Sequence, residues 1–348
     1  MTDTLSPVEP NWEGMVRNLR RQGTPERVYY FEHGIAENVQ EGLDARLGIT
    51  EHLDQSGPHY EWDRALAIHR YLGHEIFRVF PEGARLQAHS ALGQWEEPAR
   101  GPITSWEEFE AFDWIKPEDA DLSVLEYYEK ILPPNMRVTH VLDVWEVVRA
   151  LFGFETFCYK LYEEPDLVDA VFEKVGSFDC AIARSLCDFD CFGALYVSDD
   201  LGYKTGTMLS PADIRRLIIP WHKKLAEIAH SHGKFVFLHS CGNMYELIDD
   251  YIDYVQIDAK HSFEDNIMPV TEVKRRYGDR LTLLGGVDVD LLARRSEEQI
   301  RAKTREILDG CMPGGGYFLG AGNWVTEYIP VENYLVMLDE GRRYAGTG

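Results

Sequence analysis

The chain has 348 residues, of which 45% are hydrophobic and 27% charged, and its formal net charge at pH 7 is −24. This balance is typical of a globular protein, and no apolar run approaches the roughly 18 residues that a membrane span requires. Phosphate binding needs clustered Lys and Arg, and no basic run is longer than three residues, which with the net charge argues against a nucleic-acid-binding protein. The first residues, MTDTLSPVEP, lack the basic and apolar regions of a signal peptide, which predicts a cytoplasmic location.

The first part of the chain predicts few regular elements. An amphipathic helix is expected at 12–21, a first buried strand at 28–32 (VYYFE) and a second at 75–79 (EIFRV). Residues 81–134 then mix strand-like pieces, a turn and two short acidic helices. We interpret this stretch as an insertion after the second strand.

From residue 138 onward, strands and helices alternate regularly. A third strand (138–144) precedes a helix near 145–152 and a long helix at 165–190, which begins with a proline in its first turn. Three cysteines at helical spacing, Cys180, Cys187 and Cys191, are expected to be core residues. The remaining strands are predicted at 193–200, 235–240, 254–258, 281–286 and 317–322, separated by helices at 210–232, 244–251, 270–277, 297–308 and 331–344.

Eight predicted strands thus alternate with helices, and most of the strands are continuously apolar rather than alternating. Continuous apolar strands are typical of parallel sheets covered on both faces. The pattern predicts a single α/β domain over residues 1–348, a closed (β/α)8 TIM barrel with an inserted segment at 81–134.

The chemistry is expected around FVFLHSCGN, residues 235–243, because active sites of such barrels lie at the carboxyl ends of the strands. Residues two apart on a strand point the same way, so His239 and Cys241 could bind one ion. The alternative is a buried histidine and a structural cysteine. The other strand ends contribute Glu32, His33, Arg78, Asp143, Asp199, Asp200, Asp258, His261, Asp288, Asp290 and Asn323.

Capping of the following helix is a competing role for the aspartates at strand ends. We expect it for Asp288 and Asp290, whereas for Asp199, Asp200 and Asp258 function and capping remain open. The candidate catalytic residues are Glu32, His33, Asp199, Asp200 and His261.

Five segments of the second half resemble one known family. They are LYEEPDLVDAVFEKV (161–175), DDLGYKTGTMLSPADIRRLIIPWHKKL (199–225), FLHSCGNMYELIDDYIDYVQID (237–258), GGVDVDLL (285–292) and GGGYFLGAGNWVTEYIPVENY (314–334). From about residue 145 to its end, the chain resembles the uroporphyrinogen decarboxylase superfamily, which includes zinc-dependent methylcobamide:coenzyme M methyltransferases. The resemblance implies a (β/α)8 barrel.

The residues expected of a tetrapyrrole decarboxylase are missing from this sequence. The arginine-rich motif of those enzymes is absent, and Glu32 stands near its place. Their aspartate falls at 77–80, their tyrosine near Arg149 and their histidine at Ala321. A polyanionic substrate would also meet the carboxylates predicted at the mouth, which is costly. A carboxy-lyase acting on a tetrapyrrole is therefore the alternative reading.

The methyltransferase branch implies a zinc site on His239 and Cys241, with Asp258 in the place of a carboxylate ligand and Ala321 in the place of a cysteine. The remaining position would be filled by water, His261 or a substrate atom. The favoured function is a metal-dependent methyltransferase acting with a corrinoid protein or a thiol partner on a small molecule; a superfamily member of divergent activity is a further alternative. Whether the chain forms a homodimer is left open.

Overall fold

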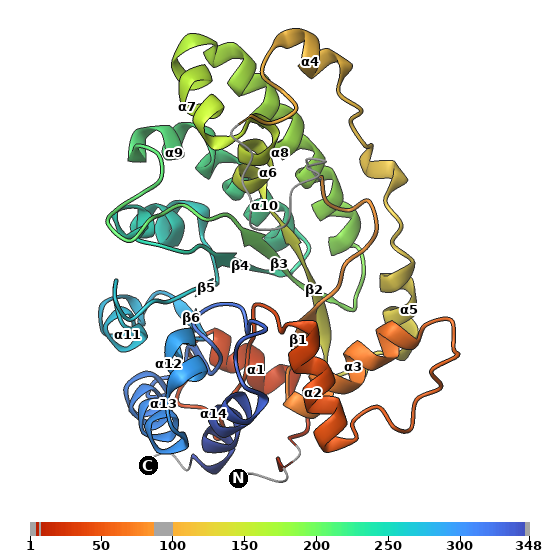
Figure 1. The fold of residues 1–348 in the computed structure, drawn as a ribbon, viewed down its shortest axis with the longest axis vertical. Helices are drawn as coiled ribbons and strands as arrows, with labels where there is room; N and C mark the ends of the chain where they lie inside the picture. Colours follow the sequence, from red (N-terminus) through yellow and green to blue (C-terminus); the bar gives the residue numbers. More distant parts are fainter. Residues whose placement is uncertain (1–4, 7, 87–99, 345–348) are drawn as a thin grey trace.

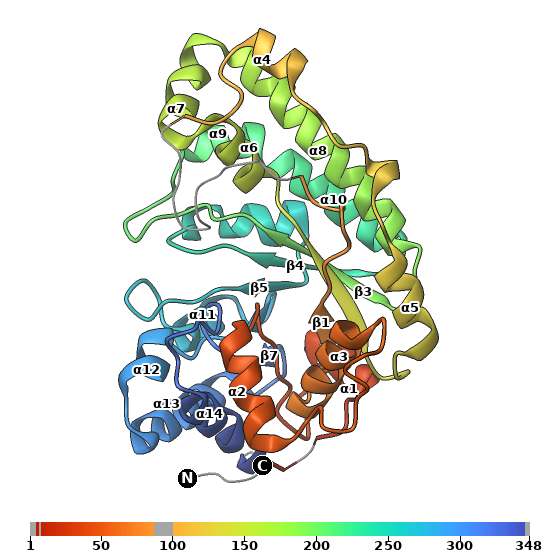
Figure 2. The ribbon, with the colours of Figure 1, turned by 45° about the vertical axis from the view of Figure 1, so that its right-hand side comes forward.

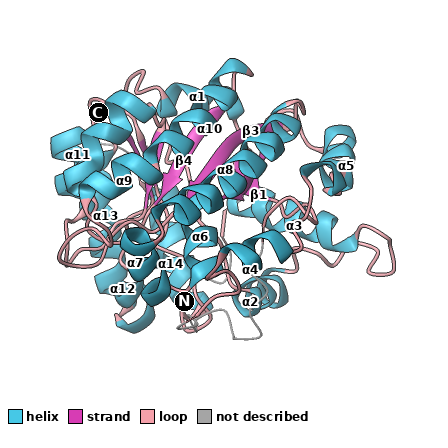
Figure 3. Cartoon of the chain, turned by 90° about the horizontal axis from the view of Figure 1, so that it is seen from above, coloured by secondary structure: helices cyan, strands magenta, loops and turns pink. Residues whose placement is uncertain are grey.

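The computed structural model describes residues 5–6, 8–86 and 100–344. Seven parallel strands form one sheet, and their order in the sheet follows the chain. Helices surround this sheet on its outer side (Figure 1, Figure 3). The strands are β1 (Ile76–Arg78), β2 (Arg137–Leu142), β3 (Phe192–Ser198), β4 (Phe235–His239), β5 (Ala259–His261), β6 (Thr282–Leu284) and β7 (Tyr317–Phe318).

The predicted first strand, 28–32, appears as a short bridge beside β7. Tyr30 pairs in parallel with Leu319. The amide of Phe31 donates to the Leu319 carbonyl (3.0 Å), and the Leu319 amide donates to the carbonyl of Tyr29 (2.8 Å). The sheet therefore curls so that the beginning of the chain lies beside its last strand, which gives a TIM-barrel-like α/β fold (Figure 2).

Most of the predicted helices are present. Ser210 and Ser296 cap α9 and α13 with their side chains, and Pro165 lies in the first turn of α8. No described helix is long and apolar enough to cross a membrane. The helices are α1 (Trp12–Leu19), α2 (Glu37–Leu47), α3 (Tyr60–Leu72), α4 (Trp106–Ala111), α5 (Ser123–Ile131), α6 (Val144–Phe152), α7 (Phe154–Glu163), α8 (Pro165–Cys187), α9 (Pro211–Leu217), α10 (Ile219–Ser231), α11 (Val270–Tyr277), α12 (Val289–Arg294), α13 (Glu297–Cys311) and α14 (Val331–Arg343).

The apolar residues form two separate cores. The larger core lies between the sheet and the outer helices. The smaller one draws alternate residues from the strands, including the aromatic rings of Phe31, Tyr196, Phe237 and Phe318, and it also contains Leu19 of α1. Since alternate residues of a strand face the same side, this second core is the barrel interior, and α1 packs against it.

The structure changes the bounds of one predicted strand. The strand predicted at 254–258 is wrong in its bounds: a π-helical segment occupies Asp250–Val255, and β5 begins only at Ala259. The interpretation of 81–134 as an insertion stays a prediction, and residues 87–99 within it lie outside the described residues. The described part contains α4 and α5, and it follows the outer side of α8 in Figure 1.

Candidate metal site

A polar layer lies directly above the aromatic rings of the barrel interior, at the carboxyl ends of the strands. His33 follows Phe31 by two residues, and His239 follows Phe237 by two, so both continue the inward-facing sides of their segments. His261 continues β5 in the same way, two residues after Ala259. All three imidazoles are buried.

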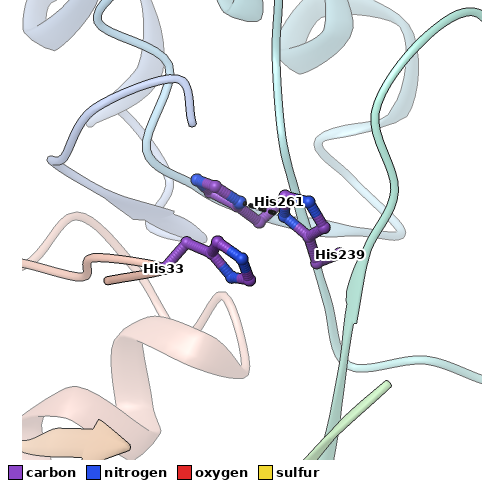
Figure 4. Close-up of side chains that lie close together, drawn as sticks. All are labelled: His33, His239 and His261. Atoms are coloured by element: carbon purple, nitrogen blue, oxygen red, sulfur yellow. Dashed lines mark hydrogen bonds between the residues drawn. The ribbon is translucent and has the colours of Figure 1, made fainter. Parts of the chain in front are cut away.

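The three histidines pack against one another (Figure 4). The rings of His33 and His239 are stacked with centroids 3.9 Å apart and an interplanar angle of 10°. Nδ1 of His239 lies 2.8 Å from Nδ1 of His261. Nδ1 of His33 lies 2.9 Å from the hydroxyl of Tyr196. Burial is the main cause that lowers the pKa of both His33 and His261 well below the ordinary value, so both rings are neutral at neutral pH.

The hydrogen bonds of His261 fix the tautomer of His239. Nε2 of His261 lies 3.2 Å from the carbonyl of Ala321, which can only accept, so this nitrogen carries the hydrogen. Nδ1 of neutral His261 must then accept, and the partner nitrogen, Nδ1 of His239, must donate. A neutral His239 therefore presents the lone pair of Nε2 to its other neighbours.

Those neighbours are a thiol and a carboxylate. Sγ of Cys241 lies 3.4 Å from Nε2 of His239, as the strand alternation predicts, and Oδ1 of Asp200 lies 3.5 Å from the same nitrogen. The carboxylate also accepts the amide hydrogen of Cys241 at 2.8 Å. A nitrogen lone pair and a carboxylate oxygen repel each other at this distance unless a cation or a proton lies between them.

The sulfur of Cys241 has two further polar neighbours. Asn323 Nδ2 donates to it at 3.2 Å, and the hydroxyl of Ser262 donates at 3.6 Å. Burial, followed by the charge of Asp200, raises the pKa of the thiol when no metal is bound. Donors aimed at the sulfur favour a thiolate, and a bound cation would reverse the direction of the shift.

The donor set fits a zinc ion. Zinc–ligand bonds of about 2.0 to 2.3 Å in a tetrahedron place ligand atoms roughly 3.3 to 3.8 Å apart. The two distances to Nε2 of His239 fall in this range, and all three ligand atoms lie within 4.8 Å of one another. The three histidines also lie within 4.8 Å of one another. They fit less well, because Nδ1 of His239 and Nδ1 of His261 already bond to each other and the rings of His33 and His239 lie in nearly parallel planes.

Hydrogen bonding keeps Asp200 ionised. Burial opposes ionisation, but the hydrogen bond from the Cys241 amide and a positive charge at Nε2 of His239, whether a proton or a bound cation, outweigh it and lower the pKa of the carboxyl below its ordinary value. The side chain of Asp200 is 40% exposed. The site is therefore reachable from the solvent at the barrel mouth.

The structure does not bring Asp258 to this group, which corrects the expected ligand set. Its carboxylate accepts from the amide of Val236 (2.8 Å) and lies 3.0 Å from Nε2 of His230. Val236 is the second residue of β4 and His239 is its last, so Asp258 lies at the opposite end of the barrel. The physical reason is the π-helical segment, which delays β5 and leaves Asp258 before the strand instead of at its end.

Asp199 and Glu32 also point away from the cluster. Asp199 is fully buried, accepts from the amides of Val144 (3.1 Å) and Glu146 (2.9 Å), and thereby caps α6. It lies one residue before Asp200 and hence on the other face of its segment. Glu32 accepts from the Ala321 amide (3.2 and 3.1 Å), and burial raises its pKa. A catalytic role for Asp199 or Glu32 stays a prediction, and in the structure both carboxylates accept hydrogen bonds from main-chain amides.

Comparison with known proteins places these features in a family. The profile for uroporphyrinogen decarboxylase (URO-D) matches residues 144–344, more than half of the chain. The chain belongs to the URO-D family. The match includes Asp200, His239 and Cys241, but it does not reach His33.

Curated URO-D relatives match only parts of the chain. Proteins named uroporphyrinogen decarboxylase are 32% identical over 71 residues in Thioalkalivibrio sulfidiphilus (20% of each chain) and 30% identical over 120 residues in Streptomyces coelicolor (34% of this chain, 32% of the relative). The chain thus matches about a fifth to a third of the length of these relatives.

A solved structure shares the whole fold with this URO-D family member. The structure of a methyltransferase from Methanosarcina mazei superimposes with a TM-score of 0.69 and 17% identity, over 96% of this chain and 98% of that one. At this identity the likeness establishes the fold.

Proposed function

We propose that this URO-D family member is a zinc-dependent methyltransferase that passes a methyl group to a thiol, with a corrinoid on a partner protein as the donor. The observation that supports it is the convergence of Nε2 of His239, Sγ of Cys241 and Oδ1 of Asp200 within 4.8 Å of one another, with both distances to Nε2 at tetrahedral spacing. The related fold of a protein described as a methyltransferase agrees with this choice.

The chain's own residues would prepare the site. His261 holds the tautomer of His239, while Ser262 and Asn323 direct donors at the sulfur. Neutral His33 covers one face of His239 without adding a charge. A zinc ion held by the three ligand atoms would lower the pKa of a thiol that enters its open position.

In the proposed transfer, the acceptor sulfur forms a bond to the methyl carbon. A corrinoid partner would supply the methyl group and keep both electrons of the broken carbon–cobalt bond, and the thiol proton would leave to solvent. Three protein ligands leave one position open, as in other catalytic zinc sites.

Two measurements test the proposal. Metal analysis of the purified protein should find about one zinc per chain, and zinc-loaded protein should consume methylcobalamin anaerobically in the presence of 3-mercaptopropionate. Cys241→Ala should abolish both signals, whereas Cys158→Ala on α7 should keep both. Zinc-loaded protein that methylates no thiol, or a Cys241→Ala variant with full metal content, would contradict it.

Decarboxylation of a tetrapyrrole is a second candidate, supported by the names of the curated relatives. The positions from which those enzymes are expected to hold their substrate carry Glu32 and Ala321 here. We therefore expect no coproporphyrinogen after anaerobic incubation with uroporphyrinogen. Turnover of roughly one per second or faster would instead favour the decarboxylase.

A further inference from the structure

One cationic side chain of the polar layer is not used by the metal site. Arg78 ends β1, two residues after Ile76 of the inner core, so it faces the barrel interior. Its Nη1 donates to the backbone carbonyl of His33 at 2.6 Å. The guanidinium carbon lies 5.3 Å from the ring centre of Trp324 and 5.0 Å from that of Phe80.

Within the described residues, Arg78 has no carboxylate partner. Its Nε is buried and has no hydrogen-bond partner. Burial lowers the pKa of Arg78 to about 10, so the group is still charged at neutral pH. A largely buried cation without a carboxylate partner is costly, and it is retained only where something else compensates.

The other cations near the mouth have oxygen partners, and the buried ammonium of Lys260 donates to the carbonyls of Ser262 (2.8 Å) and Ser240 (3.3 Å). Arg85 donates to Asp143 at 2.8 Å, and Arg149 forms an ion pair with Glu146. A divalent cation would balance the charges of the Asp200 carboxylate and the Cys241 thiolate. Arg78 keeps a buried donor, Nε, for which the described residues provide no acceptor, and none of their carboxylates forms an ion pair with it.

We propose that Arg78 binds the carboxylate of a small monoanionic substrate at the barrel mouth. The planar guanidinium matches a planar carboxylate, and the free Nε supplies one of the two donors that such a pair needs. The proposal deepens the proposed function, because it gives the thiol substrate a charged end.

The substrate's other end lies toward Cys241. Trp324 stacks under Arg78, and its neighbour Asn323 donates to the Cys241 sulfur. His33 also connects Arg78 to the metal ligands, since its carbonyl accepts a hydrogen bond from Arg78 and its ring stacks on the ring of His239. A small molecule held by Arg78 would thus extend past Trp324 and His33 to the metal ligands.

Ligand-observed NMR titrations with propionate, and with 1-propanol as a neutral match, test the site. Arg78→Gln should weaken propionate binding about tenfold, the loss of roughly one charged hydrogen-bonded contact. Arg78→Lys should show a smaller loss because the charge remains. The exposed Arg100, changed to Gln, is the matched control and should leave propionate binding unchanged.

The same titration on Cys241→Ala separates this proposal from the metal site. Propionate should bind that variant as it binds the wild type, because the Arg78 contact needs no metal. Thermal unfolding confirms that each variant is folded. Equal binding of propionate to the wild type and to folded Arg78→Gln, or binding of 1-propanol as tight as that of propionate, would overturn the proposal.

Discussion

Polar side chains at the amino end of the barrel bond to the main chain of neighbouring segments, whereas at the carboxyl end one group of them, His239, Cys241 and Asp200, face one another. Asn18 of α1 donates to the carbonyl of Tyr317 (2.8 Å) and accepts from the amide of Gly316 (3.0 Å). Asp258 likewise accepts from the amide of Val236. At the mouth, His239, Cys241 and Asp200 direct ligand atoms at one point. These amino-end residues therefore link neighbouring segments of the fold, whereas the group at the mouth could hold a metal ion.

The largest expected effect is on metal binding at the mouth. Removing the sulfur in Cys241→Ala should lower zinc affinity by more than the 10- to 100-fold typical of changes around a ligand. The unfolding midpoint of the metal-free protein should change little, since Cys241 is only half-buried. Competition with a chelating dye measures the zinc affinity. An unchanged zinc affinity in Cys241→Ala would contradict the assignment of the metal site to the mouth of the barrel.

Substitution of two aspartates, one at each end of the barrel, tests the difference between the ends directly. Asp200→Asn should weaken zinc binding by about 10- to 100-fold, because a charged ligand becomes neutral. Asp258→Asn should leave affinity unchanged, because that side chain lies at the amino end. The same dye competition applies to both variants. A loss confined to Asp258→Asn would restore the ligand set expected from sequence.

At the amino end, the effect should be on stability alone. Leu19 of α1 is buried in the inner core, and Leu19→Ala should lower the free energy of unfolding by about 2 to 4 kcal/mol. Metal content at saturation should stay at one zinc per chain. Urea unfolding of the metal-free protein measures this loss, with Ile131→Ala, a half-exposed residue of α5, as the control. A loss of zinc in a folded Leu19→Ala protein would mean that the ends are coupled.

The smallest effect concerns a titrating group near the amino end. Burial raises the pKa of Glu75 from 4.5 to about 7, against the opposing charge of Arg27. Between these values the native state binds more protons than the unfolded state, so this group's contribution to stability falls as pH rises from about 4.5 to 7. In Glu75→Gln the side chain cannot ionise, so this pH-dependent contribution to stability is absent.

Comparing the stability of wild type with that of Glu75→Gln isolates the contribution of Glu75 to the pH dependence. Urea unfolding at pH 5 and pH 7 should show that wild type loses stability relative to Glu75→Gln as the pH rises. The exposed Glu118, changed to Gln, should give a curve parallel to that of wild type. Parallel curves for wild type and Glu75→Gln would show that Glu75 is ionised throughout the range.

Much of the site follows from the sequence because the strand period is two. It places His239 and Cys241 on one face once β4 is located, and it predicted a barrel mouth that includes His33 and His261. The period could not choose between Asp199 and Asp200, because that choice depends on where β3 ends. Asp258 was misplaced because nothing in YVQID signals a π-helical segment before β5. Ser262 and Trp324 carry no signal of their own and were missed.

The pairing of Tyr30 with Leu319 has a consequence for synthesis of the chain. The ribosome delivers residue 30 long before residue 319, and the bridge between them joins the two edges of the curled sheet. Until the last strand emerges, the segment around Tyr30 lacks its neighbour, and an unpaired edge is prone to association with other chains. A nascent chain of this protein thus has to keep its aromatic inner face protected during most of its translation.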